Sequence, residues 1–377
     1  MSSATIPSRF AAADTLVEVT IEENEAIRNA ESFLSIFYER EKLHPNKVYL
    51  RQPNGDKWNE YTWAEVGIQA RKLVTSLQGM GLKKGDHIGL ISKNCYQWIV
   101  TDLAILMGGF VSVPFYATLS ASDLAEVIHL SEIKALFVGK LEDWDAQQGG
   151  VPAGLPCISF PHYPGNSQVH CEYSWQKIMS DCEPASEPHQ PTKDEIFTII
   201  FTSGTTGTPK GVMLTYHGVN EFFKYERAQP VIGLYQNCSA RVLSYLPLNH
   251  IAERTISEIG PIVTGTVVSF SSSLEDFAKN LQSVQPTGFF AVPRIWIKFQ
   301  QSILAKIPQK KLDFLLQVPF VNQWVKRKVR IAMGLNKLRI ALTGAAPLGA
   351  STIQWFAKLG INIQEVYGAT ETLGGVT

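Results

Sequence analysis

A run of ten residues, Thr202–Gly211 (TSGTTGTPKG), has the composition of a loop that binds clustered anionic oxygens. Its glycines let backbone N–H groups turn toward a ligand, its one Ser and four Thr donate hydrogen bonds, and its lysine supplies a positive charge. The run is not the P-loop G-x-x-x-x-G-K-[ST], because Gly207 stands three residues before Lys210 and a glycine follows. A flexible turn between strands, the plainer alternative, has no need of lysine, proline and four hydroxyl groups together.

Two more segments accompany this loop. Gly344–Leu348 (GAAPL) follows the apolar run LRIALT, and Val366–Thr372 (VYGATET) closes the chain's last strand-like segment. In this order, the three motifs resemble the signatures of the AMP-forming acyl-adenylate superfamily, which includes acyl-CoA synthetases, luciferases and peptide-synthetase adenylation domains. The resemblance extends from about residue 30 to the end of the chain.

The resemblance implies a role for each motif position. The β- and γ-phosphates of ATP would be held by Thr202, Ser203, Gly204, Thr205, Thr206, Gly207 and Lys210. The adenine and acyl sites would be lined by Gly344, Ala345 and Ala346, and the adenine would lie against Tyr367, beside Gly368. Thr370 would contact the α-phosphate and Glu371 would bind Mg²⁺, so Lys210, Thr370 and Glu371 are the predicted catalytic residues. These residue types suit the attack of a carboxylate on a phosphorus, where donors and a metal must neutralise developing negative charge.

The substrate class is indicated by two other segments. Leu246–Arg254 (LPLNHIAER) and Ala291–Trp296 (AVPRIW) resemble landmarks of long-chain fatty acyl-CoA synthetases. The resemblance implies that His250 stands at the mouth of an acyl pocket and Trp296 at its gate, although a helix-capping histidine and a packing tryptophan remain alternatives. ATP and a fatty acid would then give acyl-AMP and pyrophosphate, and CoA would take the acyl group. Two other hypotheses stay open: transfer to an acyl carrier protein, and a non-catalytic nucleotide-binding module.

The elements that must position these motifs alternate between helix and strand, which predicts an α/β fold with mainly parallel sheets. The polar, proline-containing stretch 183–195 divides the chain into two stacked α/β subdomains, 1–185 and 186–377. A capping box at Thr62 and Glu65 opens a predicted helix. The other predicted helices are 96–107, 123–130, 274–284 and 349–359, and the predicted strands are 87–92, 111–115, 133–138, 196–202, 241–246, 267–270, 288–292, 338–343 and 361–366.

Composition limits the class of partner. The 34 Lys and Arg balance the 34 Asp and Glu, which argues against general nucleic-acid binding. Five scattered cysteines and the lack of a signal-peptide pattern favour a cytoplasmic protein. The apolar stretch 99–119 contains Asp102, two glycines and a proline, and is predicted to be a buried helix followed by a buried strand.

Two features concern the remaining surface and the length of the chain. The segment 310–330 mixes Lys and Arg with Phe, Leu and Trp, which fits either a solvated amphipathic helix or peripheral contact with an anionic membrane. The sequence stops at Thr377, soon after YGATET. The resemblance therefore implies that the small C-terminal domain of the superfamily, with its catalytic lysine, is absent, and that this chain alone binds ATP weakly and makes little acyl-CoA.

Overall fold

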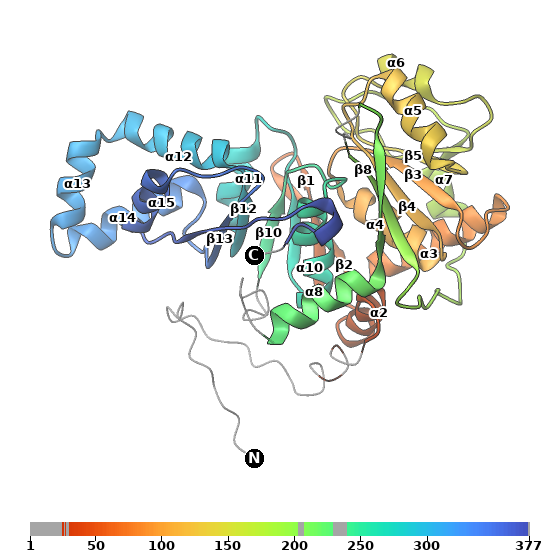
Figure 1. The fold of residues 1–377 in the computed structure, drawn as a ribbon, viewed down its shortest axis with the longest axis horizontal. Helices are drawn as coiled ribbons and strands as arrows, with labels where there is room; N and C mark the ends of the chain where they lie inside the picture. Colours follow the sequence, from red (N-terminus) through yellow and green to blue (C-terminus); the bar gives the residue numbers. More distant parts are fainter. Residues whose placement is uncertain (1–24, 26, 28–29, 203–206, 229–239, 376–377) are drawn as a thin grey trace.

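The computed structural model describes residues 25, 27, 30–202, 207–228 and 240–375, and its strands form three sheets (Figure 1). The largest has the order β7-β6-β5-β3-β4-β8-β9 and is parallel except for the antiparallel pair β8 and β9. Its strands are β3 (His87–Ile91), β4 (Val111–Phe115), β5 (Ala135–Val138), β6 (Cys157–Ser159), β7 (Tyr173–Ser174), β8 (Ile196–Thr202) and β9 (Lys210–Thr215).

Two helices on this sheet show how the sequence forms its core. Helix α3 (Trp63–Gly79) begins at the predicted capping box, in which the Thr62 hydroxyl accepts from the Glu65 N–H and the Glu65 carboxylate accepts from the Thr62 N–H. Helix α4 (Tyr96–Met107) lies between α3 and strands β3 and β4, and every one of its side chains is buried. Burial on all sides explains its continuous apolar sequence. The prediction for 99–119 is confirmed, and within the described residues no helix is long and apolar enough to cross a membrane.

The other two sheets are smaller. The four-stranded sheet has the order β10-β11-β1-β2, and the three-stranded sheet has the order β12-β13-β14. Every pair in them is parallel except the hairpin of β1 and β2. Their strands are β1 (Val48–Asn54), β2 (Lys57–Thr62), β10 (Arg241–Ser244), β11 (Val267–Phe270), β12 (Gly288–Ala291), β13 (Ile340–Thr343) and β14 (Ile363–Glu365). The predicted α/β class with mainly parallel sheets is confirmed.

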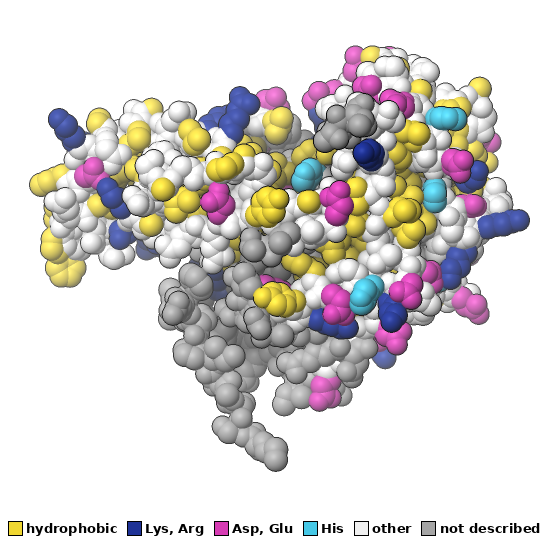
Figure 2. Space-filling view, viewed as in Figure 1, with side chains coloured by type: hydrophobic (Ala, Val, Ile, Leu, Met, Phe, Trp, Pro, Cys, Tyr) yellow, Lys and Arg dark blue, Asp and Glu magenta, His cyan; other side chains and the backbone are white. Residues whose placement is uncertain are grey.

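The remaining helices cover the sheets. Figure 1 places α11, α12, α13, α14 and α15 at one end of the molecule and the large sheet at the other. In Figure 2, hydrophobic atoms project at the end where Figure 1 shows α13. The helices not yet given are α2 (Phe33–Leu43), α5 (Ala121–Ser131), α6 (Trp144–Gln147), α7 (Trp175–Asp181), α8 (Tyr216–Ala228), α9 (Ile251–Arg254), α10 (Gly260–Thr264), α11 (Phe277–Val284), α12 (Pro293–Lys306), α13 (Gln309–Gln317), α14 (Val321–Met333) and α15 (Ala350–Lys358). Three short turns are η1 (Gln148–Gly150), the π-helical η3 (Thr255–Ile259) and η4 (Thr370–Thr372).

Sheet membership does not follow the predicted division between residues 185 and 186. Strands β8 and β9 follow that point in the chain but complete the large sheet, while β1 precedes it and pairs with β11 of the second half. One core cluster likewise runs from α2 and α4 into β10 and β11. The two subdomains therefore stay a prediction about folding units, and the sheets exchange strands across the proposed boundary.

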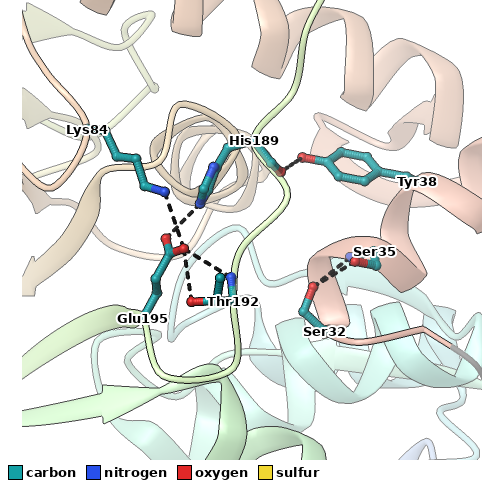
Figure 3. Close-up of polar contacts among 7 residues, drawn as sticks. All are labelled: Ser32, Ser35, Tyr38, Lys84, His189, Thr192 and Glu195. Carbon is teal, nitrogen blue, oxygen red and sulfur yellow. Dashed lines mark hydrogen bonds and ion pairs between the residues drawn. The ribbon is translucent and has the colours of Figure 1, made fainter.

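The stretch predicted as a linker is fastened to the body of the protein (Figure 3). The Glu195 carboxylate accepts hydrogen bonds from the Thr192 backbone N–H (3.0 Å) and from its hydroxyl group (3.1 Å). It also lies 2.7 Å from His189 Nε2 and 3.3 Å from Lys84 Nζ. Burial opposes ionisation of Glu195, but these donors and charges outweigh it and hold its pKa at about 2. The loop is thus a surface connection with a fixed conformation at this end.

Candidate active site

The phosphate loop joins two antiparallel strands at one end of the large sheet. Thr202 ends β8 and stands opposite Lys210, the first residue of β9. The Thr202 hydroxyl donates to the Lys210 carbonyl oxygen at 3.5 Å, and the Lys210 side chain is exposed. Gly207 has a φ of 91° in open space, a conformation that glycine adopts without strain. The predicted phosphate-binding residues Ser203, Gly204, Thr205 and Thr206 lie outside the described residues.

The GAAPL and YGATET motifs lie against each other. The Val366 N–H donates to the Thr343 carbonyl oxygen at 2.8 Å, and the Glu365 carboxylate accepts from the Leu348 N–H at 3.0 Å. A Cβ added to Gly344 would lie 2.9 Å from the Val366 carbonyl oxygen. Glycine is therefore required there by the close approach of the two segments. Ala345 follows at a φ of 65°, which turns the loop away from β13.

The YGATET segment presents its chemistry to solvent. Tyr367 is 72% exposed, so a face of its ring is open to a planar ligand. Gly368 is close to Gly374, because an added Cβ would lie 2.3 Å from the Gly374 carbonyl carbon. Thr370 and Glu371 form the first turn of η4, and Glu371 is exposed. The segment therefore offers an aromatic face, a hydroxyl group and a carboxylate within five residues.

The fold brings the YGATET segment to β9, the strand that follows the phosphate loop in the sequence. Turn η4 packs against β9, the strand that begins at Lys210. Beyond η4, the Thr255 hydroxyl donates to the Leu373 carbonyl oxygen at 3.0 Å and so attaches the segment to η3. Figure 1 shows the dark-blue C-terminal segment crossing from the α15 side of the molecule to its centre. Segments about 160 residues apart in the sequence thus lie close together in the fold, and their joining in one nucleotide site stays a prediction.

The side chain of Glu371 is chemically suited to binding a magnesium ion. Its carboxylate is exposed and makes no ion pair with another described residue. Within the described part of the chain, no three His, Cys, Asp or Glu side chains gather as a metal site. Mg²⁺ is usually bound by one or two carboxylates together with substrate phosphates and water, so a single exposed glutamate is a donor of the right kind.

A mostly apolar pocket of about 400 Å³ lies beside these motifs. It runs along the parallel strands of the two smaller sheets. Residues at the amino ends of β10, β11, β12 and β13 line one end, and Phe290, Leu342 and Val366 line the end toward GAAPL and YGATET. Further wall residues are Ala252, Thr255, Ile256, Pro261, Leu373 and Gly374. The pocket therefore connects the nucleotide motifs with an apolar interior, an arrangement that the sequence alone does not reveal.

The two predicted substrate residues lie in different surroundings. His250 is exposed and caps α9, accepting at Nδ1 from the Ala252 N–H at 3.2 Å. Loss of water around the ring lowers the pKa of His250, so the neutral form dominates at pH 7. Trp296 is fully buried among aromatic rings and donates its indole N–H to the Leu342 carbonyl oxygen at 3.3 Å. Trp296 thus stands behind the pocket wall, and its predicted role as a gate stays untested.

A buried charge cluster holds α9 against the large sheet. The Arg254 guanidinium pairs with Asp102 of α4 and, at 2.9 Å, with Glu258. It also donates to the Thr198 hydroxyl of β8 at 2.6 Å. Burial raises the pKa of Glu258, with the Asp102 charge as a second cause, which favours the protonated form of Glu258 beside Arg254. Sequence reasoning missed this role of Arg254, although the residue closes the LPLNHIAER segment.

A second buried acid, Glu253, directly precedes Arg254 in the sequence. Glu253 accepts from the hydroxyl groups of Ser244 and Ser257, each at 2.8 Å, and from the Tyr245 N–H at 3.1 Å. Burial outweighs these hydrogen bonds and raises its pKa to about 7. Asn94 donates to Ser244 and to the Leu246 carbonyl oxygen, which fixes the loop before α9. Both buried acids therefore position the helix that carries His250 and part of the pocket wall.

Comparison with known proteins gives the chain a family. A family model described as AMP-binding enzyme matches residues 37–377. The long-chain-fatty-acid–CoA ligase ACSBG2 of Rattus norvegicus is 27% identical over 365 residues, covering 86% of this chain and 54% of the relative. The long-chain-fatty-acid–CoA ligase FadD15 of Mycobacterium bovis is 28% identical over 387 residues, covering 95% of this chain and 64% of the relative. The chain thus spans between half and two thirds of the length of these relatives.

Solved structures agree on the fold. The adenylation domain of a carboxylate reductase from Mycobacterium chelonae superposes with a TM-score of 0.76 at 18% identity, covering 93% of this chain and 59% of that one. The N-terminal domain of FACL13 from Mycobacterium tuberculosis superposes with a TM-score of 0.69 at 21% identity, covering 92% and 77%. The match over residues 37–377 shows that this chain belongs to the family of AMP-binding enzymes, with the fold of its adenylate-forming domain.

Proposed function

We propose that this chain forms the adenylate of a long-chain fatty acid within an acyl-CoA synthetase. The fatty acid carboxylate attacks the α-phosphorus of ATP, giving acyl-AMP and pyrophosphate, and the thiol of CoA then displaces AMP to give acyl-CoA. The observation that carries the proposal is the apolar pocket that opens beside the nucleotide motifs. An alkyl chain buried there removes apolar surface from water, which gives the site affinity for fatty acids over small polar acids.

The motif residues would divide the work. Lys210 and the phosphate loop would neutralise the departing pyrophosphate, and Thr370 would donate a hydrogen bond to the α-phosphate. Tyr367 would stack against the adenine ring. Glu371 would hold the Mg²⁺ that accompanies ATP, whose charge offsets that of the phosphates. His250 caps α9, whose residue Ala252 lines the pocket, a position consistent with the mouth of the acyl site.

Calorimetric titration of the 377-residue chain tests this proposal. A non-hydrolysable long-chain acyl-adenylate analogue should bind, and Lys210→Ala or Thr370→Ala should weaken binding at least tenfold. Lys83→Ala, at an exposed lysine outside the motifs, is the matched control and should bind as the wild type does. Undiminished binding by both motif variants would contradict the assigned roles.

The acceptor is tested separately. In a chain extended to the full length of the relatives, CoA should accept the acyl group from the adenylate, measured as acyl-CoA formed. Transfer to a holo acyl carrier protein in place of CoA would contradict the acceptor proposed here. Adenylate formation that survives Glu371→Ala unchanged would contradict the magnesium assignment. Binding of ATP without any adenylate formation by the extended wild-type chain would favour a non-catalytic nucleotide-binding module.

A further inference from the structure

Charge is unevenly distributed along this chain. Residues 293–334, which form α12, α13 and α14, contain nine Lys and Arg and one Asp, a formal net charge of +8, although the whole chain is neutral. The one acid, Asp313, is neutralised by Lys358 of α15 at 3.2 Å. The rest of the chain holds the compensating negative charge. A single surface region therefore carries a strong positive field, which attracts an anionic partner.

The same region exposes aromatic side chains. Phe314 of α13 is 66% exposed, Phe320 between the helices is 92% exposed, and Trp324 of α14 is 61% exposed. The opposite side of α14 is buried through Val325, Val329 and Met333. The helix is therefore anchored by one face and presents the other outward. Isolated exposed apolar residues are ordinary, but three large aromatic rings on one helical hairpin mark an interaction surface.

The hairpin turn keeps its aromatic residue outside the protein. Pro319 precedes Phe320 and ends the preceding helical run, and Phe320 itself has a φ of 65°. Bulky residues rarely occupy this region, so the backbone is strained at the residue whose side chain is most exposed. Trp324 lies one turn further, and the Lys328 ammonium stands 5.6 Å from the centre of its ring. Aromatic and basic groups are therefore interleaved at the tip.

We propose that this basic aromatic tip, formed by Lys310, Lys311, Phe314, Phe320, Trp324 and Lys328, docks on the surface of an anionic lipid bilayer. Tryptophan and phenylalanine partition into the interface between headgroups and acyl chains, while lysine and arginine bind anionic headgroups. The hairpin projects from one end of the molecule, where hydrophobic atoms are seen in Figure 2, so it can meet a plane without steric conflict.

The proposed contact of the tip with the membrane is peripheral. No described helix is long and apolar enough to span it. The inference rests on charge and exposure alone and does not depend on the proposed function, because neither the pocket nor the nucleotide motifs enter it. If both hold, the tip would bring the site to the place where fatty acids are concentrated.

Co-sedimentation with vesicles tests the docking. The 377-residue chain should bind phosphatidylcholine vesicles that contain about 30% phosphatidylserine, bind pure phosphatidylcholine at least tenfold more weakly, and dissociate in about 0.5 M salt. The triple variant Lys310→Gln, Lys311→Gln and Lys328→Gln should lose roughly 100-fold in affinity, because each basic side chain near the surface contributes roughly fivefold. The matched triple variant Lys57→Gln, Lys83→Gln and Lys134→Gln, at exposed lysines elsewhere, should bind like the wild type.

The aromatic contribution has its own variant and control. Phe320→Ser with Trp324→Ser should weaken binding to the anionic vesicles at least tenfold, whereas Leu274→Ser, at a leucine that is 79% exposed elsewhere, should not. All eight tryptophans are described, and Trp324 is the exposed one among them. Brominated lipid should therefore quench tryptophan fluorescence in the wild type and fail to do so in Trp324→Phe.

Several results would overturn the proposal. Equal binding to neutral and anionic vesicles would remove the role of the basic residues, and binding unchanged in both tip variants would place the contact elsewhere. Binding to an acidic soluble protein or to nucleic acid, with none to vesicles, would assign the tip to that partner. If the double serine variant fails to fold, judged by far-ultraviolet circular dichroism, the lysine variant and the quenching experiment still decide.

Discussion

Substitution of Gly288 by leucine should shorten the pocket and change which acyl chains bind. Gly288 begins β12 and lines the end of the pocket away from the nucleotide motifs. Its φ is not positive, and an added Cβ would meet only the Val242 side chain at 3.8 Å, an ordinary contact. Leucine therefore fits the backbone at this position, and its side chain should occupy part of the open pocket.

The magnitude follows from the carbon atoms displaced. A leucine side chain has the bulk of roughly four methylene groups, and each buried methylene contributes about 0.8 kcal/mol. An acyl chain that fills the pocket should lose about 3 kcal/mol of binding free energy, roughly two orders of magnitude in Kd. A chain about four carbons shorter should bind the variant as tightly as it binds the wild type.

Titration calorimetry with a series of acyl-adenylate analogues of increasing chain length measures this effect. In the wild type, affinity should rise with each methylene until the pocket is full, and in Gly288→Leu the rise should stop earlier. Gly79→Leu, at a glycine with open space around it at the end of α3, serves as the control. An unchanged length profile, or an equal loss for all lengths, would refute the assignment of the pocket to the acyl chain.

Three further predictions concern buried and partly buried charges. Arg254→Met leaves Asp102 buried without its partner, so urea unfolding should show a loss of about 3–5 kcal/mol, and a loss below about 1 kcal/mol would contradict the charge cluster. Because the pKa of Glu253 is raised to about 7, the folded protein retains a proton that the unfolded chain releases, and stability should fall by about 3 kcal/mol as pH rises from 4.5 to 7. Glu253→Gln should lack this decline in stability. A pH profile of stability identical to that of the wild type would contradict the raised pKa of Glu253. The pKa of Glu195 is held at about 2, so the stabilisation that its carboxylate gives is present above pH 4.5 and is lost as the pH falls toward 2. Glu195→Gln should therefore lower the free energy of unfolding by about 1 kcal/mol at pH 7, after allowance for solvent screening. In thermal unfolding the difference from the wild type should shrink progressively below pH 4.

Helices were predicted correctly where neighbouring residues in the sequence determine where they begin and end. The capping box at Thr62 and Glu65 gave the correct start of α3, and the apolar run 96–107 coincides with α4. The hairpin of β1 and β2 was not predicted, although the two residues of its turn, Gly55-Asp56, are a hairpin signal and Gly55 has a φ of 60°. Strand β9 was also missed, because it directly follows the glycine-rich loop.

Contacts between residues far apart in the chain could not be predicted from the sequence, for a physical reason. The pairing of β1 with β11 joins residues more than 200 positions apart, and no periodicity records such a partner. Arg254 and Asp102 are 152 positions apart, and an arginine in an amphipathic helix is ordinarily exposed. The motifs GAAPL and YGATET were located by resemblance, whereas the pocket that lies beside them depends on packing between two sheets and could be found only in the structure.

A crystal structure of this chain with a long-chain acyl-adenylate analogue would test the central claim most directly. The account predicts that the adenine lies against Tyr367 and beside Gly344, and that the alkyl chain follows the pocket past Leu342 toward Gly288. An adenosine bound at these motifs with its alkyl chain outside the pocket would contradict the claim, and an analogue bound away from the motifs would contradict the site as a whole.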